Sequence, residues 1–135
     1  MSFDPTVDYP LGSRRPDLVE TPSGLALEEV TLDSARGGTL VAADVRATPA
    51  TLRRQAEVAR VTGRRQLADN LERAAELAGV PDDQLLAIYT ALRPGRSTVA
   101  ELEQWALRLD DWDAPRTAAF VREAAAAYEQ RGLGV

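Results

Sequence analysis

Two clusters of carboxylates are the side chains of this sequence that could most directly bind a metal or catalyse a reaction. Asp110, Asp111 and Asp113 lie close together in the chain, as oxygen ligands of a divalent cation would. A calcium loop also needs further ligands, a glycine and a bidentate glutamate at fixed offsets, and these are missing, so the spacing favours a solvated loop between helices. Asp82 and Asp83 follow a proline in what reads as a first helical turn, where carboxylates complement the helix dipole.

Arginine supplies every basic side chain of the sequence, because all sixteen basic residues are Arg and none is Lys. Arg14-Arg15, Arg53-Arg54 and Arg64-Arg65 form doublets that could contact phosphate or an acidic partner. Asp and Glu surround these doublets, which favours exposed faces with salt bridges. Arg93 and Arg96 flank a Pro-Gly corner, where guanidinium groups either bond the last carbonyls of the preceding helix or grip a partner.

Three aromatic side chains and one glycine-rich segment complete the candidates. Tyr89, Trp105 and Trp112 are expected in the core or at an interface rather than stacked on a cofactor. The segment SARGGT, from Ser34 to Thr39, has neither the P-loop nor the dinucleotide-binding spacing, and no strand precedes it.

Missing residue types exclude most catalytic classes. The sequence has no Cys and no His, which removes thiolate zinc sites and Ser-His-Asp or Cys-His catalysis. Without Lys there is neither a P-loop lysine nor a side-chain Schiff base. A paired-carboxylate hydrolase is the one self-sufficient enzyme left, and nothing places two carboxylates in an apolar cleft. We therefore assign no catalytic, cofactor-binding or metal-binding residue to this chain.

Charge and hydropathy narrow the partners and the location. A net charge of −5 argues against duplex nucleic acid as a partner, because a binder needs a basic footprint. No run approaches the roughly 20 apolar residues that cross a bilayer, and the start of the chain lacks the features of a signal peptide. The expected location is the cytoplasm.

The elements that position these residues read as helices after an irregular start. Residues 1–30 carry four prolines yet also scattered Leu, Tyr and Phe anchors, which favours an extended arm that lies on its own bundle or on a partner. We expect the other helices to pack around the stretch Arg73–Thr98. There Gly79 ends one helix, Pro81 takes the first position of the next, and a Pro-Gly pair stops that helix before Thr98 caps another.

The remaining helices start at recognisable caps. Thr31 caps a short helix, and Thr48-Pro49 starts a longer one that ends near a glycine; another helix spans about Arg64 to Ala78. The apolar periodicity predicts inward stripes. These are Leu52, Ala56 and Ala59; Leu67, Leu71, Ala74 and Ala78; Leu85, Ile88, Tyr89 and Leu92; Val99, Leu102, Ala106 and Leu109; and Phe120, Ala124, Ala127 and Tyr128.

This pattern predicts an all-α fold, an open up-and-down helical bundle with an extended N-terminal arm. The expected division is an arm over residues 1–30 that contacts a partner and a helical domain over residues 31–135. The many inward alanines make the core thin, as in a subunit docked on a larger protein.

Six ordered blocks carry a family resemblance over most of the chain. Among them are DYPL at Asp8–Leu11, LEEVTLDSARGG at Leu27–Gly38, and RRQLADNLERAAELAGVPDDQLLAIYTALRPGRST at Arg64–Thr98. AAFVREAAAAYEQRG closes the set at Ala118–Gly132. The chain resembles the small subunit of the adenosylcobalamin-dependent diol/glycerol dehydratases.

The resemblance implies a large, a medium and a small chain, usually doubled, that convert 1,2-diols or glycerol to aldehydes and water by radical chemistry. In that family the large chain is a TIM barrel that holds substrate, and the medium chain helps to hold the corrinoid. The small chain is helical, supports the large one and supplies no catalytic residue. Adenosylcobalamin would accordingly be bound by the other subunits.

The sequence departs from the family in three places. Gly95 stands where the family often has an aromatic residue, which removes one large contact, and the helix over Ser97–Leu109 is less similar. A long N-terminal extension associated with microcompartments is absent, so that association is not expected. The resulting prediction is a non-catalytic subunit of a B12-dependent diol or glycerol dehydratase; the alternative is a stand-alone helical protein–protein interaction module.

Overall fold

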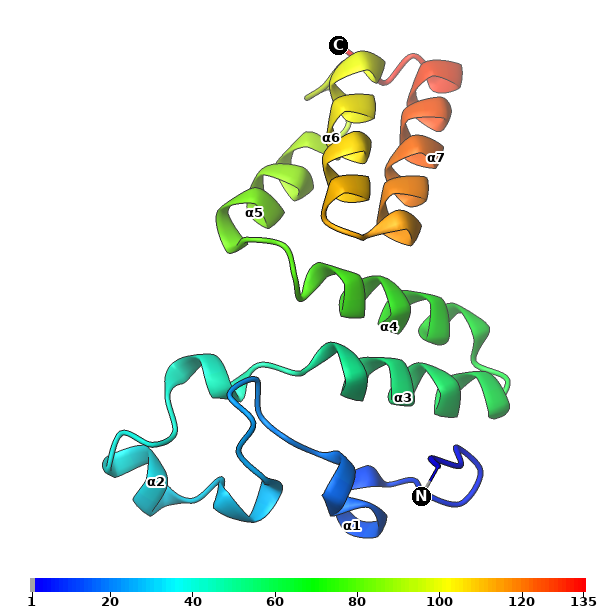
Figure 1. Ribbon diagram of the computed structural model, residues 1–135. Helices are drawn as coiled ribbons and strands as arrows, with labels where there is room; N and C mark the ends of the chain where they lie inside the picture. The colour runs from blue at the N-terminus through cyan, green and yellow to red at the C-terminus, as the bar shows by residue number, and fades with distance from the viewer. Residues whose placement is uncertain (1) are drawn as a thin grey trace. The chain divides into compact units, whose positions relative to one another are not determined.

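The computed structural model describes residues 2–135, and within them every regular element is helical (Figure 1). The only β pairing of this described part is an isolated bridge between Glu20 and Ala26. The predicted all-α class is therefore confirmed. The helices are α1 (Leu11–Arg14), α2 (Leu32–Arg36), α3 (Pro49–Val61), α4 (Arg65–Leu77), α5 (Asp82–Ala91), α6 (Val99–Asp111) and α7 (Pro115–Arg131), with 3₁₀ turns η1 (Pro16–Leu18), η2 (Leu27–Glu29) and η3 (Ala42–Val45).

The chain divides into two compact units, one that ends at Ala78 and one from Gly79 to Val135. In the first unit, α3 and α4 form an antiparallel hairpin (Figure 1). Its core is made of Ala56, Ala59 and Ala68, with Leu71 packed against it. Because alanine side chains are short, the two helices pack on small groups, and each buried residue contributes little hydrophobic stabilisation.

The N-terminal segment of the first unit is more structured than an extended arm. Short helical turns interrupt it at α1, η1 and η2, and Leu11 of α1 is buried. The Nη1 atom of Arg54 in α3 donates a hydrogen bond to the carbonyl oxygen of Leu18 over 2.9 Å. This bond ties the segment to the α3–α4 hairpin.

In the second unit, α6 and α7 form another antiparallel hairpin, which α5 precedes (Figure 1). Leu102, Leu109 and Val121 are the largest fully buried side chains. The Tyr128 hydroxyl of α7 donates to the carbonyl oxygen of Leu92 over 2.5 Å, just past the end of α5. This bond fixes the last turn of α5 to the hairpin.

The predicted helix starts are confirmed where a hydroxyl side chain makes the cap. The hydroxyls of Thr31, Thr48 and Thr98 each accept a hydrogen bond from the backbone N–H three residues on. Thr98 and Glu101 complete the predicted capping box of α6. Pro81 differs from the prediction, because it is the N-cap of α5, with extended ψ of 141°, rather than its first helical residue.

The predicted inward stripes are correct for α3 and most of α6. They are correct in part for α5, where Ile88 is buried, and for α4, where Leu71 packs on the core, and largely wrong for α7. In α4 the buried residues are Ala68 and Ala75, while Leu67 and Ala78 are exposed. In α7 the buried residues are Thr117, Ala118, Val121 and Ala125, and the predicted Phe120 is exposed. Val99 of α6 is exposed too, as is Tyr89 of α5. The physical reason is that alanines on several sides of these helices make neighbouring faces nearly equal in hydropathy, so the periodicity does not fix the phase.

Candidate interaction surfaces

The acidic candidates lie at the ends of helices in the second unit. Asp110 accepts a hydrogen bond from Nη2 of Arg122 at 2.9 Å, and Asp113 takes a left-handed φ of 56° in the turn between α6 and α7. Asp83, in the first turn of α5, accepts from Nε2 of Gln84, and this bond lowers the pKa of its carboxyl. Within residues 2–135, no three His, Cys, Asp or Glu side chains gather in a way that could hold a metal ion.

The arginine doublets do not behave as uniform exposed faces. Arg15 is only 8% exposed, so the expected surface position is wrong for this residue. Its guanidinium forms ion pairs with Asp17 at 2.8 Å and Asp8 at 3.1 Å and also donates to the carbonyl of Ser2. The hydrogen bond from Arg15 lowers the pKa of Asp17. Arg15 therefore orders the N-terminal segment around itself.

Asp44 is a second buried polar centre of the first unit, and nothing local in the sequence identified it. Its Oδ1 accepts the N–H of Ser23 over 3.1 Å and its Oδ2 accepts the N–H of Val41 over 3.0 Å. Hydrogen bonds to the charged form, above all from Ser23, lower the pKa of Asp44. One carboxylate thus joins two loop segments that are far apart in sequence.

The ion pairs of Arg122 in the second unit, called the arginine clamp below, were also not predicted from the sequence. Nε of Arg122 in α7 donates to Glu103 of α6 over 2.9 Å, while its Nη2 donates to Asp110, further along α6. These bonds raise the pKa of Arg122, the bond to Asp110 most. The clamp joins the two helices of the hairpin on their polar side, so its partners have a structural use in the chain itself.

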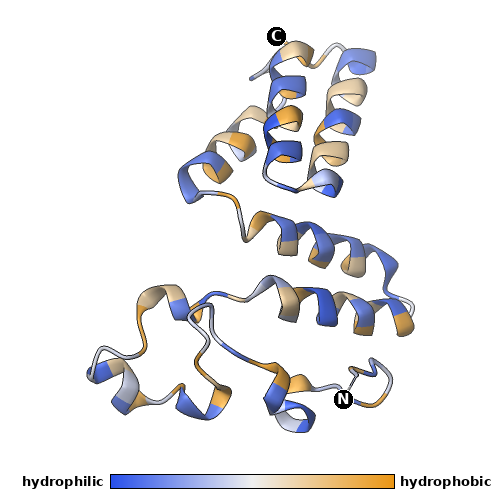
Figure 2. Ribbon diagram, viewed as in Figure 1, coloured by the Kyte–Doolittle hydropathy of each residue, from blue (hydrophilic) through white to orange (hydrophobic). Residues whose placement is uncertain are grey.

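Several large apolar side chains are exposed on both units. In the second unit, Leu86 and Tyr89 stand one helical turn apart on α5 and are 68% and 55% exposed. The colouring of Figure 2 shows hydrophobic residues along most of α5 after its hydrophilic first turn. The others are Val7, Tyr9, Val30, Leu32, Val41, Val45, Val61, Leu67, Val99, Leu107, Phe120, Leu133 and Val135. Scattered exposed apolar side chains are normal on a protein surface, whereas neighbouring ones on one helix face, such as Leu86 and Tyr89, form a candidate docking surface.

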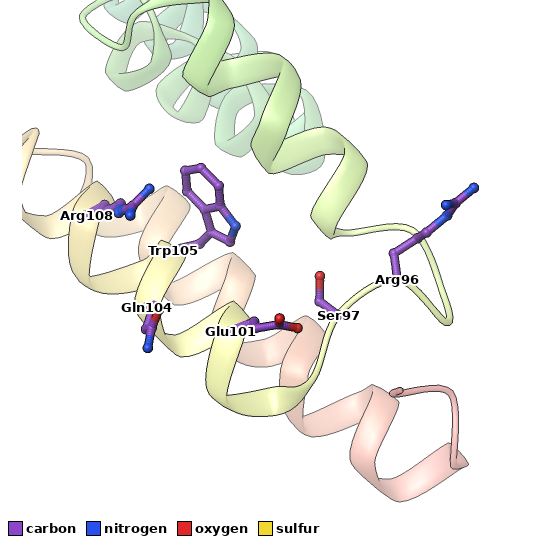
Figure 3. Close-up of a pocket in the computed structure, with 6 residues that line it drawn as sticks. All are labelled: Arg96, Ser97, Glu101, Gln104, Trp105 and Arg108. Atoms are coloured by element: carbon purple, nitrogen blue, oxygen red, sulfur yellow. The ribbon is translucent and has the colours of Figure 1, made fainter.

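A polar groove lies beside the exposed face of α6 (Figure 3). Its walls include Ser97, Glu101, Gln104, Trp105 and Arg108. The guanidinium of Arg108 lies 4.8 Å from the centre of the Trp105 ring, which is a cation–π contact. Trp105 is half-buried, and its ring packs against an arginine of its own helix.

Comparison with known proteins identifies the family of this chain. Residues 5–133 match the family model described as dehydratase small subunit. The chain belongs to the dehydratase small subunit family. Among its relatives is the propanediol dehydratase small subunit of Citrobacter freundii, which is 50% identical over 125 residues, or 92% of this chain and 73% of the relative. The propanediol dehydratase small subunit of Salmonella typhimurium is 49% identical over the same length, with 92% and 72% covered.

Membership in the dehydratase small subunit family confirms the resemblance read from the ordered sequence blocks. The buried Arg15 and Asp44 both have hydrogen-bond partners within their own unit. No helix within residues 2–135 combines the length and the apolar content needed to cross a bilayer.

Proposed function

We propose that this chain is the non-catalytic small subunit of a B12-dependent diol dehydratase, a complex that converts a 1,2-diol such as propane-1,2-diol, or glycerol, to an aldehyde and water. The observation that carries the proposal is identity near 50% to propanediol dehydratase small subunits across 92% of the chain. Because the match covers nearly the whole chain, it includes the exposed surfaces that a partner would recognise as well as the core.

The chemistry of the donor set supports placing the cofactor on other chains. Adenosylcobalamin supplies the radical that starts the reaction, and the difficult chemistry belongs to it. This chain has no His to ligate cobalt and no Cys or Lys as an alternative nucleophile. We therefore assign none of its residues to cobalt ligation or to cofactor binding.

The partners in this proposal are a large TIM-barrel chain and a medium chain, present in a doubled three-chain assembly in the cytoplasm. The arm over residues 1–30 contacts the large chain, and the helical domain over residues 31–135 completes the contact. Exposed apolar residues in the arm, such as Val7, Tyr9 and Val30, support this role. Burial of such side chains favours association by about 25 cal/mol per Å² of apolar surface.

The test is reconstitution with the large and medium chains encoded in the same genome. We expect all three chains to co-purify, and we expect the complex to form aldehyde from propane-1,2-diol when adenosylcobalamin is added. The small chain alone should form none. Turnover by the homogeneous small chain would contradict the proposal, as would a complex that is equally active and stable without it.

A second reading, a stand-alone helical interaction module, makes the opposite prediction. In that case the chain would remain a stable monomer when mixed with the two larger chains. Size-exclusion chromatography of the mixture distinguishes the two hypotheses, because only a dehydratase subunit would elute at the same volume as the larger chains.

A further inference from the structure

The outer face of α5 combines exposed apolar side chains with unpaired positive charge. Leu86 and Tyr89 lie on this face, and Arg93 and Arg96 follow at its C-terminal end. No carboxylate occurs in the sequence between Gln84 and Ala100, although the whole chain carries 21 acidic residues. Within residues 2–135, neither Arg93 nor Arg96 forms an ion pair.

The corner that carries the two arginines is held in place by its own hydrogen bonds. The buried hydroxyl of Ser97 donates to the carbonyl oxygen of Ala91, which satisfies the last turn of α5. The N–H of Gly95 donates to the carbonyl of Leu133 over 2.7 Å, and the N–H of Val135 donates to that of Ser97. A face on such a braced corner is ordered before a partner arrives, which lowers the entropic cost of binding.

The acidic side chains that flank this stretch in the sequence have other hydrogen-bond partners. Glu101 is occupied by the capping box, where it accepts the N–H of Thr98 at 2.8 Å. Asp83 lies at the opposite end of α5, where it accepts from Gln84. Arg96 is exposed at one end of the groove that Trp105 and Arg108 also line (Figure 3).

We propose that the outer face of α5 docks on the large dehydratase chain, at an apolar groove whose edge carries carboxylates opposite Arg93 and Arg96. This assignment rests on the proposed function, and it adds the contact surface and the chemistry of the partner. Tyrosine and arginine are the residue types that most often dominate binding energy when an interface buries them.

A second copy of this chain is a poorer occupant for the same face. Leu86 and Tyr89 together expose roughly 250 Å² when fully extended side chains of this size are taken as about 200 Å² each. A stable dimer buries about 800 Å² on each partner. One ten-residue helix, about 15 Å long, does not supply that area by itself, whereas on the large chain this face adds to the contacts that the proposed function assigns to the N-terminal arm.

The experiment measures binding of the full-length small chain to the assembled large and medium chains. We expect Tyr89→Asp to weaken the apparent affinity at least tenfold, because it places a carboxylate against the proposed acidic edge and removes an apolar anchor. Arg93→Glu should weaken binding several-fold at low salt and less at high salt, because its contribution is electrostatic. Leu107→Asp on α6 and Arg131→Glu at the end of α7 are the matched controls, and both should stay within twofold of the wild-type chain.

The outcomes separate this inference from the proposed function. If the wild-type chain does not bind the larger chains, the proposed function fails. If it binds and Tyr89→Asp binds equally well while circular dichroism shows both to be folded, only the α5 assignment fails. Equal losses in Tyr89→Asp and Leu107→Asp would also overturn it. So would sedimentation that shows a wild-type dimer which Tyr89→Asp dissociates, because the occupant would then be a second copy.

Discussion

Replacement of Leu109 by alanine tests the core of the second unit most directly. Leu109 lies in the last half of α6 and is 0% exposed. The change removes three carbon atoms, and at about 0.8 kcal/mol per buried CH₂ the lost transfer free energy alone is about 2.4 kcal/mol. The unfilled cavity adds to this, so we expect the free energy of unfolding to fall by about 3–4 kcal/mol.

The assay is urea denaturation followed by tryptophan fluorescence. Both tryptophans of the chain, Trp105 and Trp112, lie in the second unit, so the signal reports on that unit alone. The matched control is Leu107→Ala, because Leu107 lies two residues earlier on the same helix and is 54% exposed. We expect this control to change the free energy by less than about 0.5 kcal/mol. Equal losses in the two variants would refute the assignment of the buried face of α6.

Three further predictions concern caps, backbone and charge. Thr98→Ala removes the hydroxyl that caps α6 and should cost about 1 kcal/mol in the same urea assay, with no change in the slope of the transition. Gly95→Ala should cost about 1–2 kcal/mol, because Gly95 has a φ of 71° that a Cβ disfavours while no atom crowds the added methyl group; an unchanged urea midpoint would contradict this. The lowered pKa of Asp44 means that its carboxylate stabilises the fold above the pKa of the unfolded chain, near 4, and that this contribution disappears as the pH falls through the lower folded value. Asp44→Asn should therefore lower stability at pH 7 and flatten the loss of helicity below pH 4 in circular dichroism, and a variant with the wild-type acid profile would show that the carboxylate has no such role.

Local signals in the sequence were sufficient to find the helices from α2 onward, but not the short α1 within the predicted arm. The starts at Thr31, Thr48 and Thr98 were predicted because a cap is made by residues within three positions of one another. The family blocks were sufficient to find the relatives, because they follow one another over most of the chain.

The contacts that hold separate segments together were not predictable from local patterns. Asp44 bonds Ser23 across 21 positions, and Arg15 bonds Asp8 and Ser2 across a turn that no spacing rule describes. The helix phases were missed for a different reason. In α7 the run of alanines offers several faces of similar hydropathy, so the exposed Phe120 drew the predicted stripe to the wrong side. Only the packing of α7 on α6 selects among these faces.

Alanine accounts for nine of the fifteen buried apolar residues among residues 2–135, and this affects how quickly the chain is degraded in a cell. A methyl group removes little surface from water, so an unassembled copy should open often enough for proteases to cut it. Binding to a larger chain stabilises only the folded form, and so it should protect the copies that are bound. The amount of this protein in the cell would then follow the amount of its partner, and excess copies would be short-lived.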